Sequence, residues 1–307
     1  MLTRANQIRG LAIAVLSLML IAGCDSGSSG GSDTASADRQ AGLDNVEAMA
    51  KEHANDTTEP SEGAQKAPQR AVISERLPYA EVDDQLVYGD FVFPADMVEP
   101  LPAVIMIHEW WGLNDNIRAM AERLAGEGYI VLAVDLFDGE VAESVRDARQ
   151  LMTRVVEQPD SASENIRQAY EFVDSIAGAP RVASLGWCFG GGWSLNTALL
   201  FPDDLDAAVI YYGQVTDDDE QLQPLNVPIL GLFAEKDTGI KVESVEAFAA
   251  ALERLRKPHD IHIYPGARHA FANPTGNAYD AKAADDAWQR TLQFLQENLG
   301  ESEDAGN

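Results

Sequence analysis

Hydrophobic positions from about residue 74 onward follow two periods in turn, and each period predicts a different element. An unbroken apolar run such as 103–107 is typical of a strand that is covered on both faces. After that run, Ile117, Met120 and Leu124 recur three and four positions apart, which places them on one face of a helix. Strands and helices are therefore expected to alternate along the chain.

This alternation continues to about residue 300 and predicts a single α/β domain, 74–300. The predicted strands are 86–93, 103–107, 129–134, 182–186, 207–211, 228–233 and 261–264. The predicted helices are 117–124, 141–155, 162–176, 190–200, 245–252 and 283–299. The first strand is expected to be antiparallel. The strand–helix alternation after it favours a mostly parallel sheet with helices on both faces.

The first 23 residues have the pattern of a secretory signal peptide. The start is basic, and the apolar run 11–22 is shorter than the ~20 residues that span a bilayer. The run ends in Leu20-Ile-Ala-Gly-Cys24, which resembles the lipobox of bacterial lipoproteins. That resemblance implies cleavage before Cys24 and lipidation of its thiol. An ordinary signal peptide that happens to contain Cys24 is the alternative.

The lipobox resemblance also implies a location. Asp25 follows the cysteine, and in enteric-type bacteria an aspartate there resembles the signal for retention at the inner membrane. We expect an exported lipoprotein on the periplasmic side, held at the inner membrane by its lipid alone. Residues 24–73 are small and polar and predict a flexible tether, with at most a transient helix over 46–54. Residues 301–307 are predicted to be a solvated acidic tail.

The charge balance excludes one class of partner. Acidic residues outnumber basic ones 50 to 22, for a net charge of −28. Such a surface repels phosphate backbones, so no nucleic-acid partner is expected, and solubility or adaptation to high salt explains the charge. The two cysteines, Cys24 and Cys188, are too few for a disulfide scaffold or a Cys-rich metal site. Neither a metal nor another cofactor is expected, because the histidines lack ligand spacing.

Chemistry is indicated where the strand 182–186 meets the helix 190–200. The junction reads Gly186-Trp-Cys188-Phe-Gly190, a nucleophile elbow with cysteine in place of serine. Glycines flank the central residue because a Cβ at their positions would clash between strand and helix. The helix N-terminus beside the sulfur favours a thiolate and an oxyanion. A tightly packed turn around a small buried cysteine is the alternative.

Two later residues complete a nucleophilic triad. In enzymes built on this turn the chain order is nucleophile, acid, histidine. His269 lies in the loop after the last predicted strand, which suits a general base. Asp237 follows the strand 228–233 and is placed to orient that imidazole, with Glu235 as the nearby rival.

Together these motifs resemble the dienelactone hydrolase family of α/β hydrolases over about Val87 to Leu299. The resemblance rests on Gly186-Trp-Cys-Phe-Gly-Gly191, Glu109-Trp-Trp-Gly112, Asp237 and Gly266-Ala-Arg-His-Ala-Phe271. It implies an α/β-hydrolase fold with Cys188 as nucleophile, His269 as base and Asp237 as the orienting acid.

The resemblance also implies roles around the nucleophile. The backbone N–H groups of Phe189 and Trp110 would form the oxyanion hole. Glu109 would modulate the nucleophile by accepting the proton of the resting thiol when substrate arrives. A strand-end carboxylate in water is the alternative for Glu109.

The substrate is the least determined feature. Dienelactones carry a carboxylate, which namesakes of the family bind with two arginines. Arg146 lies about where one of them would sit, but Asn273 stands where the second is expected. Dienelactone itself is therefore a doubtful substrate. Tryptophans near the motifs suggest an apolar or aromatic ester pocket, or else part of the core; they are Trp110, Trp111, Trp187 and Trp193.

These inferences converge on a membrane-tethered hydrolase of a small ester or lactone that works through an acyl-thioester. Two alternatives stay open. One is an acyl-thioester hydrolase or peptidase on the same triad. The other is a non-catalytic binding lipoprotein that retains the fold.

Overall fold

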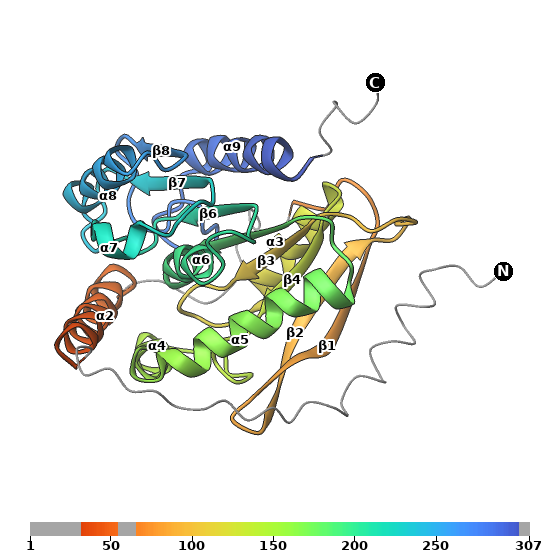
Figure 1. The fold of residues 1–307 in the computed structure, drawn as a ribbon, viewed down its shortest axis with the longest axis horizontal. Coiled ribbons are helices and arrows are strands. Elements are labelled where there is room, and N and C mark those ends of the chain that lie inside the picture. Colours follow the sequence, from red (N-terminus) through yellow and green to blue (C-terminus); the bar gives the residue numbers. More distant parts are fainter. Residues whose placement is uncertain (1–31, 55–65, 301–307) are drawn as a thin grey trace.

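The computed structural model describes residues 32–54 and 66–300 (Figure 1). The predicted signal peptide, Cys24 and the predicted tail 301–307 lie outside these ranges. None of the helices in the described part of the chain has the length and apolar character that crossing a bilayer requires.

One sheet of eight strands organises the described residues. The strands are β1 (Val72–Val82), β2 (Gln85–Pro94), β3 (Ala103–Ile107), β4 (Ile130–Val134), β5 (Val182–Trp187), β6 (Ala207–Tyr211), β7 (Ile229–Ala234) and β8 (His259–Tyr264). The helices are α2 (Ser32–Glu52), α3 (Asp115–Gly126), α4 (Val145–Glu157), α5 (Pro159–Glu171), α6 (Phe189–Leu200), α7 (Asp219–Leu222), α8 (Val242–Arg254) and α9 (Ala281–Leu299), with a π-helical turn at Phe172–Ile176 after α5.

The strand order is β1-β2-β4-β3-β5-β6-β7-β8. Strands β3 to β8 are parallel to one another, whereas β2 pairs with both β1 and β4 in antiparallel fashion. The predicted α/β-hydrolase fold, a mostly parallel sheet with helices, is confirmed. The carboxyl ends of β3 and β5 lie side by side, with Ile107 opposite Gly186. This edge is where an open α/β sheet places its ligands.

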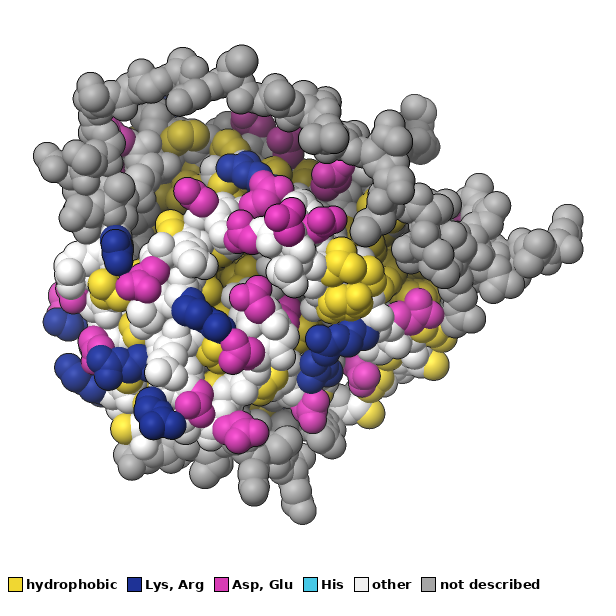
Figure 2. All heavy atoms as spheres, turned by 90° about the horizontal axis from the view of Figure 1, so that it is seen from below, with side chains coloured by type: hydrophobic (Ala, Val, Ile, Leu, Met, Phe, Trp, Pro, Cys, Tyr) yellow, Lys and Arg dark blue, Asp and Glu magenta, His cyan; other side chains and the backbone are white. Residues whose placement is uncertain are grey.

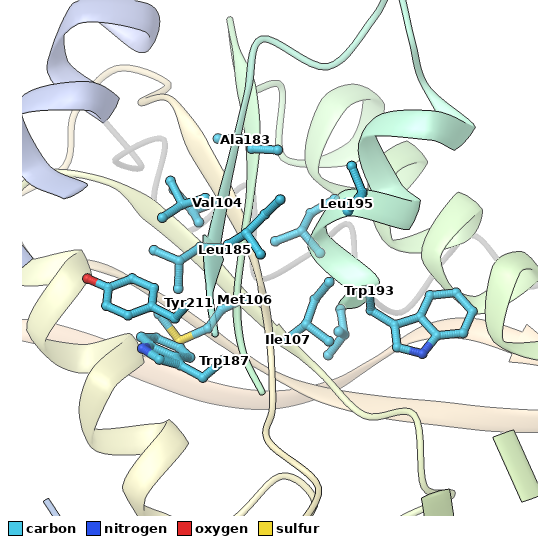
Figure 3. Close-up of a cluster of buried hydrophobic side chains, with 14 of the residues drawn as sticks. Val104, Met106, Ile107, Ala183, Leu185, Trp187, Trp193, Leu195 and Tyr211 are labelled. Atoms are coloured by element: carbon cyan, nitrogen blue, oxygen red, sulfur yellow. The ribbon is translucent and has the colours of Figure 1, made fainter. Parts of the chain in front are cut away.

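The core lies on both faces of the central strands. Met106 and Ile107 are consecutive and point to opposite faces, as pleating requires. In Figure 3, Met106 lies with Trp187 and Tyr211, whereas Ile107 lies on the side of Trp193. All five of these side chains are buried. Each face is thus filled by large apolar side chains, which fixes the register of the strands that carry the site.

The surface excess of acid is not gathered in one patch on the face shown in Figure 2. There, acidic and basic side chains lie interspersed among uncharged ones. This distribution fits a solvated surface and offers no obvious acidic binding site on that face.

Three elements were not predicted from the sequence, and one of them is the single-turn helix α7. Strand β1 begins at Val72 and was not predicted, because it lies at the sheet edge and carries charged residues instead of a continuous apolar run. Residues 32–52, expected to belong to a flexible tether over 24–73, form the helix α2. This helix lies beside α4 in Figure 1. From residue 39 to residue 54, where side chains are described, the buried ones are those of Val46, Met49 and His53, the residue after the helix. Contact with the rest of the domain stabilises α2, although its sequence contains few large apolar residues.

Candidate active site

The turn between β5 and α6 has the strained geometry of a nucleophile elbow. Cys188 has φ 55°, the left-handed region that residues with a side chain rarely adopt. A Cβ on Gly186 would lie 2.0 Å from the carbonyl oxygen of Gly190. A Cβ on Gly190 would lie 2.3 Å from that of Ile107. Only glycine fits at both positions, so the sequence specifies this turn.

Hydrogen bonds lock Cys188 between the sheet and the helix. Its N–H donates to the carbonyl oxygen of Tyr211 on β6 at 3.0 Å. Its own carbonyl oxygen accepts from the N–H groups of Gly191 and Gly192 in the first turn of α6. The sulfur therefore lies at the N-terminus of a helix, where unpaired N–H groups stabilise negative charge.

Asp237 and His269 form a buried pair on two loops. The Asp237 Oδ2 atom lies 2.6 Å from Nδ1 of His269, and both side chains are 1% exposed. The other oxygen of Asp237 accepts from the N–H groups of Gly239 and Ile240, at 2.9 and 2.7 Å. Because these donors hold the carboxylate, it fixes the orientation of the ring and leaves Nε2 for another partner.

Glu235, the alternative acid, contacts other residues than His269. Its carboxylate accepts from the N–H of Gly266 at 2.8 Å and pairs with Lys236 at the surface. These contacts lower its pKa. The acid next to the imidazole is therefore Asp237.

The charges of Cys188 and His269 depend on each other. Burial alone would raise the pKa of the Cys188 thiol, but His269 and then His53 outweigh it and lower the pKa to about 6. Burial alone would lower the pKa of His269, but Asp237 and Cys188 hold it well above its usual value. At neutral pH the pair is thus a thiolate and an imidazolium.

Helix α2 and the residue that follows it cover this pair. The Met49 Sδ atom lies 3.4 Å from the Cys188 Sγ atom, and His53 Nε2 lies 3.8 Å from it. The His53 ring stacks on Trp110 with the ring centroids 4.8 Å apart and meets His269 edge-on at 5.3 Å. Cys188 is only 2% exposed. Sequence reasoning missed this, although Val46, Met49 and His53 have the spacing of one helical face.

Glu109 is buried near the pair, not in water. It is 2% exposed, and its carboxylate accepts from Asn273 Nδ2 at 2.5 Å and from Tyr212 Oη at 3.5 Å. The Tyr212 ring in turn meets His269 at 5.1 Å. Burial and then Glu109 raise the pKa of Tyr212, so it stays a neutral donor. Asn273, where a substrate-binding arginine was expected, thus anchors a buried carboxylate.

Arg146 lies at the start of α4 and points into solvent. Its side chain is 85% exposed, with its guanidinium 3.8 Å from its neighbour Asp147. It borders an open cleft that residues 140–154 form. Its predicted contact with substrate stays a prediction, and this exposed position adds no support to it.

The four tryptophans near the motifs divide into two groups. Trp110 and Trp111 pack against His53 at the site. Trp187 and Trp193 belong to the core, on opposite faces of the sheet (Figure 3). Of the four tryptophans, the two that lie at the site thus both come from the segment after β3.

One group of donor atoms has the composition of a metal site. Donor atoms of His53, Cys188 and His269 lie within 4.8 Å of one another, and all three residues are buried. The thiolate and the imidazolium already neutralise each other, so we assign these atoms to nucleophile chemistry.

Comparisons of sequence agree on one family. The sequence profile of the dienelactone hydrolase family matches residues 89–299. A protein of Saccharolobus solfataricus, assigned by name as a carboxymethylenebutenolidase, is 34% identical over 240 residues, which cover 66% of this chain and 92% of that protein. An Escherichia coli K12 protein assigned the same name is 33% identical over 220 residues, 66% of this chain and 79% of its own length.

Comparison of structures gives the same result. The crystal structure of a protein from Klebsiella pneumoniae, described as a dienelactone hydrolase, superimposes with a TM-score of 0.66 at 27% identity. The match covers 74% of this chain and all of that chain. Strands β3 to β8, the elbow and the loops that carry Asp237 and His269 all lie within the residues matched by the family profile.

Proposed function

The chain belongs to the dienelactone hydrolase family, and we propose that it hydrolyses small carboxylic esters or lactones through an acyl-thioester on Cys188. The observation that carries the proposal is the buried cluster of Asp237, His269 and Cys188, in which Asp237 holds His269 and donor atoms of His269 and Cys188 lie within 4.8 Å of each other. Asp237 orients His269 through a hydrogen bond, and His269 in turn lowers the pKa of the Cys188 thiol. A thiolate at a helix N-terminus beside an oriented imidazolium is an activated nucleophile.

The reaction needs two steps. The Cys188 thiolate attacks the carbonyl carbon, and the imidazolium of His269 gives its proton to the leaving alcohol, which leaves an acyl-thioester. Neutral His269 then takes a proton from water, and the hydroxide attacks the thioester carbonyl. The thiolate leaves, the carboxylic acid is released, and the imidazolium is restored. Asp237 stabilises the imidazolium in both steps.

Two backbone N–H groups are proposed to bind the oxyanion. Phe189 is the first residue of α6, where helical N–H groups have no partner within the helix. Trp110 follows β3, whose carboxyl end lies next to that of β5. Removing one such donor typically lowers the rate by about 10²–10³.

Glu109 is proposed to modulate the nucleophile. Its burial and its contact with Tyr212, which meets the ring of His269, support an electrostatic link to the pair. The family resemblance implies that Glu109 takes the thiol proton when substrate arrives. Because His269 already lowers the pKa of the thiol, we propose instead that Glu109 acts on the pair through Tyr212. A buried acid of this kind favours a neutral ester over a substrate with its own carboxylate.

A substrate panel tests the reaction class. The full chain is assayed with p-nitrophenyl acetate, an aliphatic lactone, an acyl thioester and a peptide, with the Cys188→Ala protein as the blank. Hydrolysis of the ester and the lactone above the blank supports the proposal. Turnover of only the thioester or only the peptide would favour those activities on the same triad. No turnover of any substrate would favour a binding protein.

The pH profile should report the state of the thiol. We expect kcat/KM for a neutral ester to rise as pH increases through about 6, because the thiolate forms there. It should fall only at alkaline pH, where the imidazolium that protonates the leaving group is lost. If the midpoint of the rising limb lay near pH 8.5 instead, at the pKa of about 8.5 that an unperturbed thiol has, the result would contradict the ion pair.

We also propose that residues 1–23 export the chain and that Cys24 carries a lipid on the periplasmic side of the inner membrane. The basic start, the short apolar run and the lipobox support this. In a bacterial host given a radioactive fatty acid, the wild-type protein should carry label and sediment with membranes. Cys24→Ser should do neither, and an unlabelled wild-type protein in the soluble fraction would refute the anchor.

A further inference from the structure

We propose that α2, with His53 just after it, is an intramolecular cover that closes the active site until the helix is displaced. The inference rests on the proposed function only where it treats Cys188 as the nucleophile of an active site. The closure itself rests on contacts. Figure 1 shows α2 at one side of the molecule beside α4.

The cover occupies the place where a substrate must bind. A reacting carbonyl carbon has to come within about 3–3.5 Å of the nucleophile. The Met49 Sδ atom lies 3.4 Å from the Cys188 Sγ atom, so it fills that position. His53 Nε2 contacts the same sulfur, at 3.8 Å. Substrate and the closed position of α2 are therefore mutually exclusive.

One face of the segment makes the closure tight. Val46, Met49 and His53 are each 1% exposed, while other positions of the same helix, including Ala41 and Lys51, are exposed. The His53 ring completes the closure by stacking on Trp110. Met49 and His53 of this segment thus lie directly against Cys188 and His269.

Polar contacts along the exposed rim hold the helix in place. Arg39 pairs with Glu157 at 3.2 Å, and Glu47 pairs with Arg149, both pairs joining α2 to α4. At the other end, the N–H of Thr238 donates to Glu52 at 3.0 Å, next to the catalytic acid Asp237. The ion pairs lie in solvent, where salt weakens them.

The helix has little stability of its own, which makes the cover reversible. A helix of this length depends on packing for its stability, and from residue 39 onward, where the side chains of α2 are described, Val46 and Met49 are its buried apolar residues. Gly42 within it lowers helix propensity further. Segments with so few buried contacts open more readily than the core of a domain. We expect α2 to detach while the sheet stays folded.

Thiol labelling of the full chain tests the cover. Iodoacetamide reacts with Cys188, and mass spectrometry of the peptide that contains it separates this reaction from any at Cys24. Val46→Asp places a charge on the buried face of α2, and Ala41→Asp places the same charge on its exposed face. Circular dichroism and tryptophan fluorescence show whether the domain stays folded.

We expect Val46→Asp to be labelled at Cys188 at least about tenfold faster than the wild-type protein, and Ala41→Asp at the wild-type rate. High salt should also speed labelling of the wild-type protein, because it screens the two ion pairs. Hydrogen exchange of residues 39–54 should be faster than that of β5 and faster still in Val46→Asp. Equal labelling rates in all three proteins would overturn the cover.

The labelling result is independent of turnover. If neither the wild-type protein nor Val46→Asp hydrolyses an ester or lactone, although Val46→Asp exposes Cys188, the proposed function fails and the cover stands. If the wild-type protein hydrolyses esters and Val46→Asp changes neither labelling nor kcat/KM, the cover fails and the proposed function stands.

Discussion

Replacing Cys188 with alanine is expected to lower kcat/KM for p-nitrophenyl acetate by at least about 10⁴. In enzymes with a nucleophilic triad, loss of the nucleophile alone costs about as much as loss of the whole triad, up to about 10⁶. The sulfur is the only candidate at the elbow, and its lowered pKa keeps it ionised. The Asp237–His269 hydrogen bond does not involve it and should survive the substitution.

Cys188→Ser is the matched variant for this test. It replaces the thiol with a hydroxyl, a nucleophile of similar size. A hydroxyl is a far weaker acid than a thiol, so His269 would have to remove its proton during attack. We expect partial activity, between those of the wild-type and the alanine proteins. Thermal unfolding of all three proteins separates loss of chemistry from loss of fold. An alanine variant as active as the wild type would remove Cys188 from the mechanism.

Changing Asp237 to asparagine is expected to lower kcat/KM by about 10⁴, because the amide no longer stabilises the imidazolium and favours the wrong tautomer of His269. The size of the effect follows from burial. The carboxylate and the ring are both shielded from water, so no solvent molecule can replace the lost charge. Steady-state kinetics on the same ester measure it.

Glu235→Gln supplies the control for Asp237→Asn. Both changes replace a carboxylate with an amide in the same loop after β7, but Glu235 lies at the surface and pairs with Lys236. We expect its activity to stay within about threefold of the wild type, as is usual for an exposed pair. Similar losses in both variants would mean that the loop, and not the charge beside His269, controls activity.

The sheet and the elbow could be predicted because their residues have few alternatives. Strands covered on both faces are rich in apolar residues, and β3 to β7 show this pattern, with Ser184 of β5 as an exception. Gly186 and Gly190 are fixed by contacts that leave no room for a Cβ. Asp237 and His269 were located from chain order, because each lies in a loop just after the carboxyl end of a parallel strand.

The cover could not be predicted from local pattern. The segment that contains α2 is rich in small and polar residues, so its composition indicates a flexible chain. Its helix is stabilised by contacts with Cys188, Trp110 and α4, which lie far away in the sequence. His53 was placed in the tether for that reason, although it contacts the nucleophile.

Asn273 shows a different limit of sequence reasoning. The family resemblance implies a substrate-binding arginine at this position. From the sequence, the asparagine showed only that this arginine is missing. The structure shows what the asparagine does instead. It donates to the buried carboxylate of Glu109, and its own oxygen accepts from Thr275 at 2.9 Å. A buried partner of this kind is invisible until the loop is folded.

The most direct measurement of the central claim is the site of acylation. The full chain is mixed with a slowly hydrolysed p-nitrophenyl ester, stopped with acid, digested and analysed by mass spectrometry. The account predicts that the peptide containing Cys188 carries the acyl group as a thioester that hydroxylamine releases, and that Asp237→Asn protein acquires it more slowly. An acyl group on a different residue during turnover, with Cys188 unmodified, would contradict it.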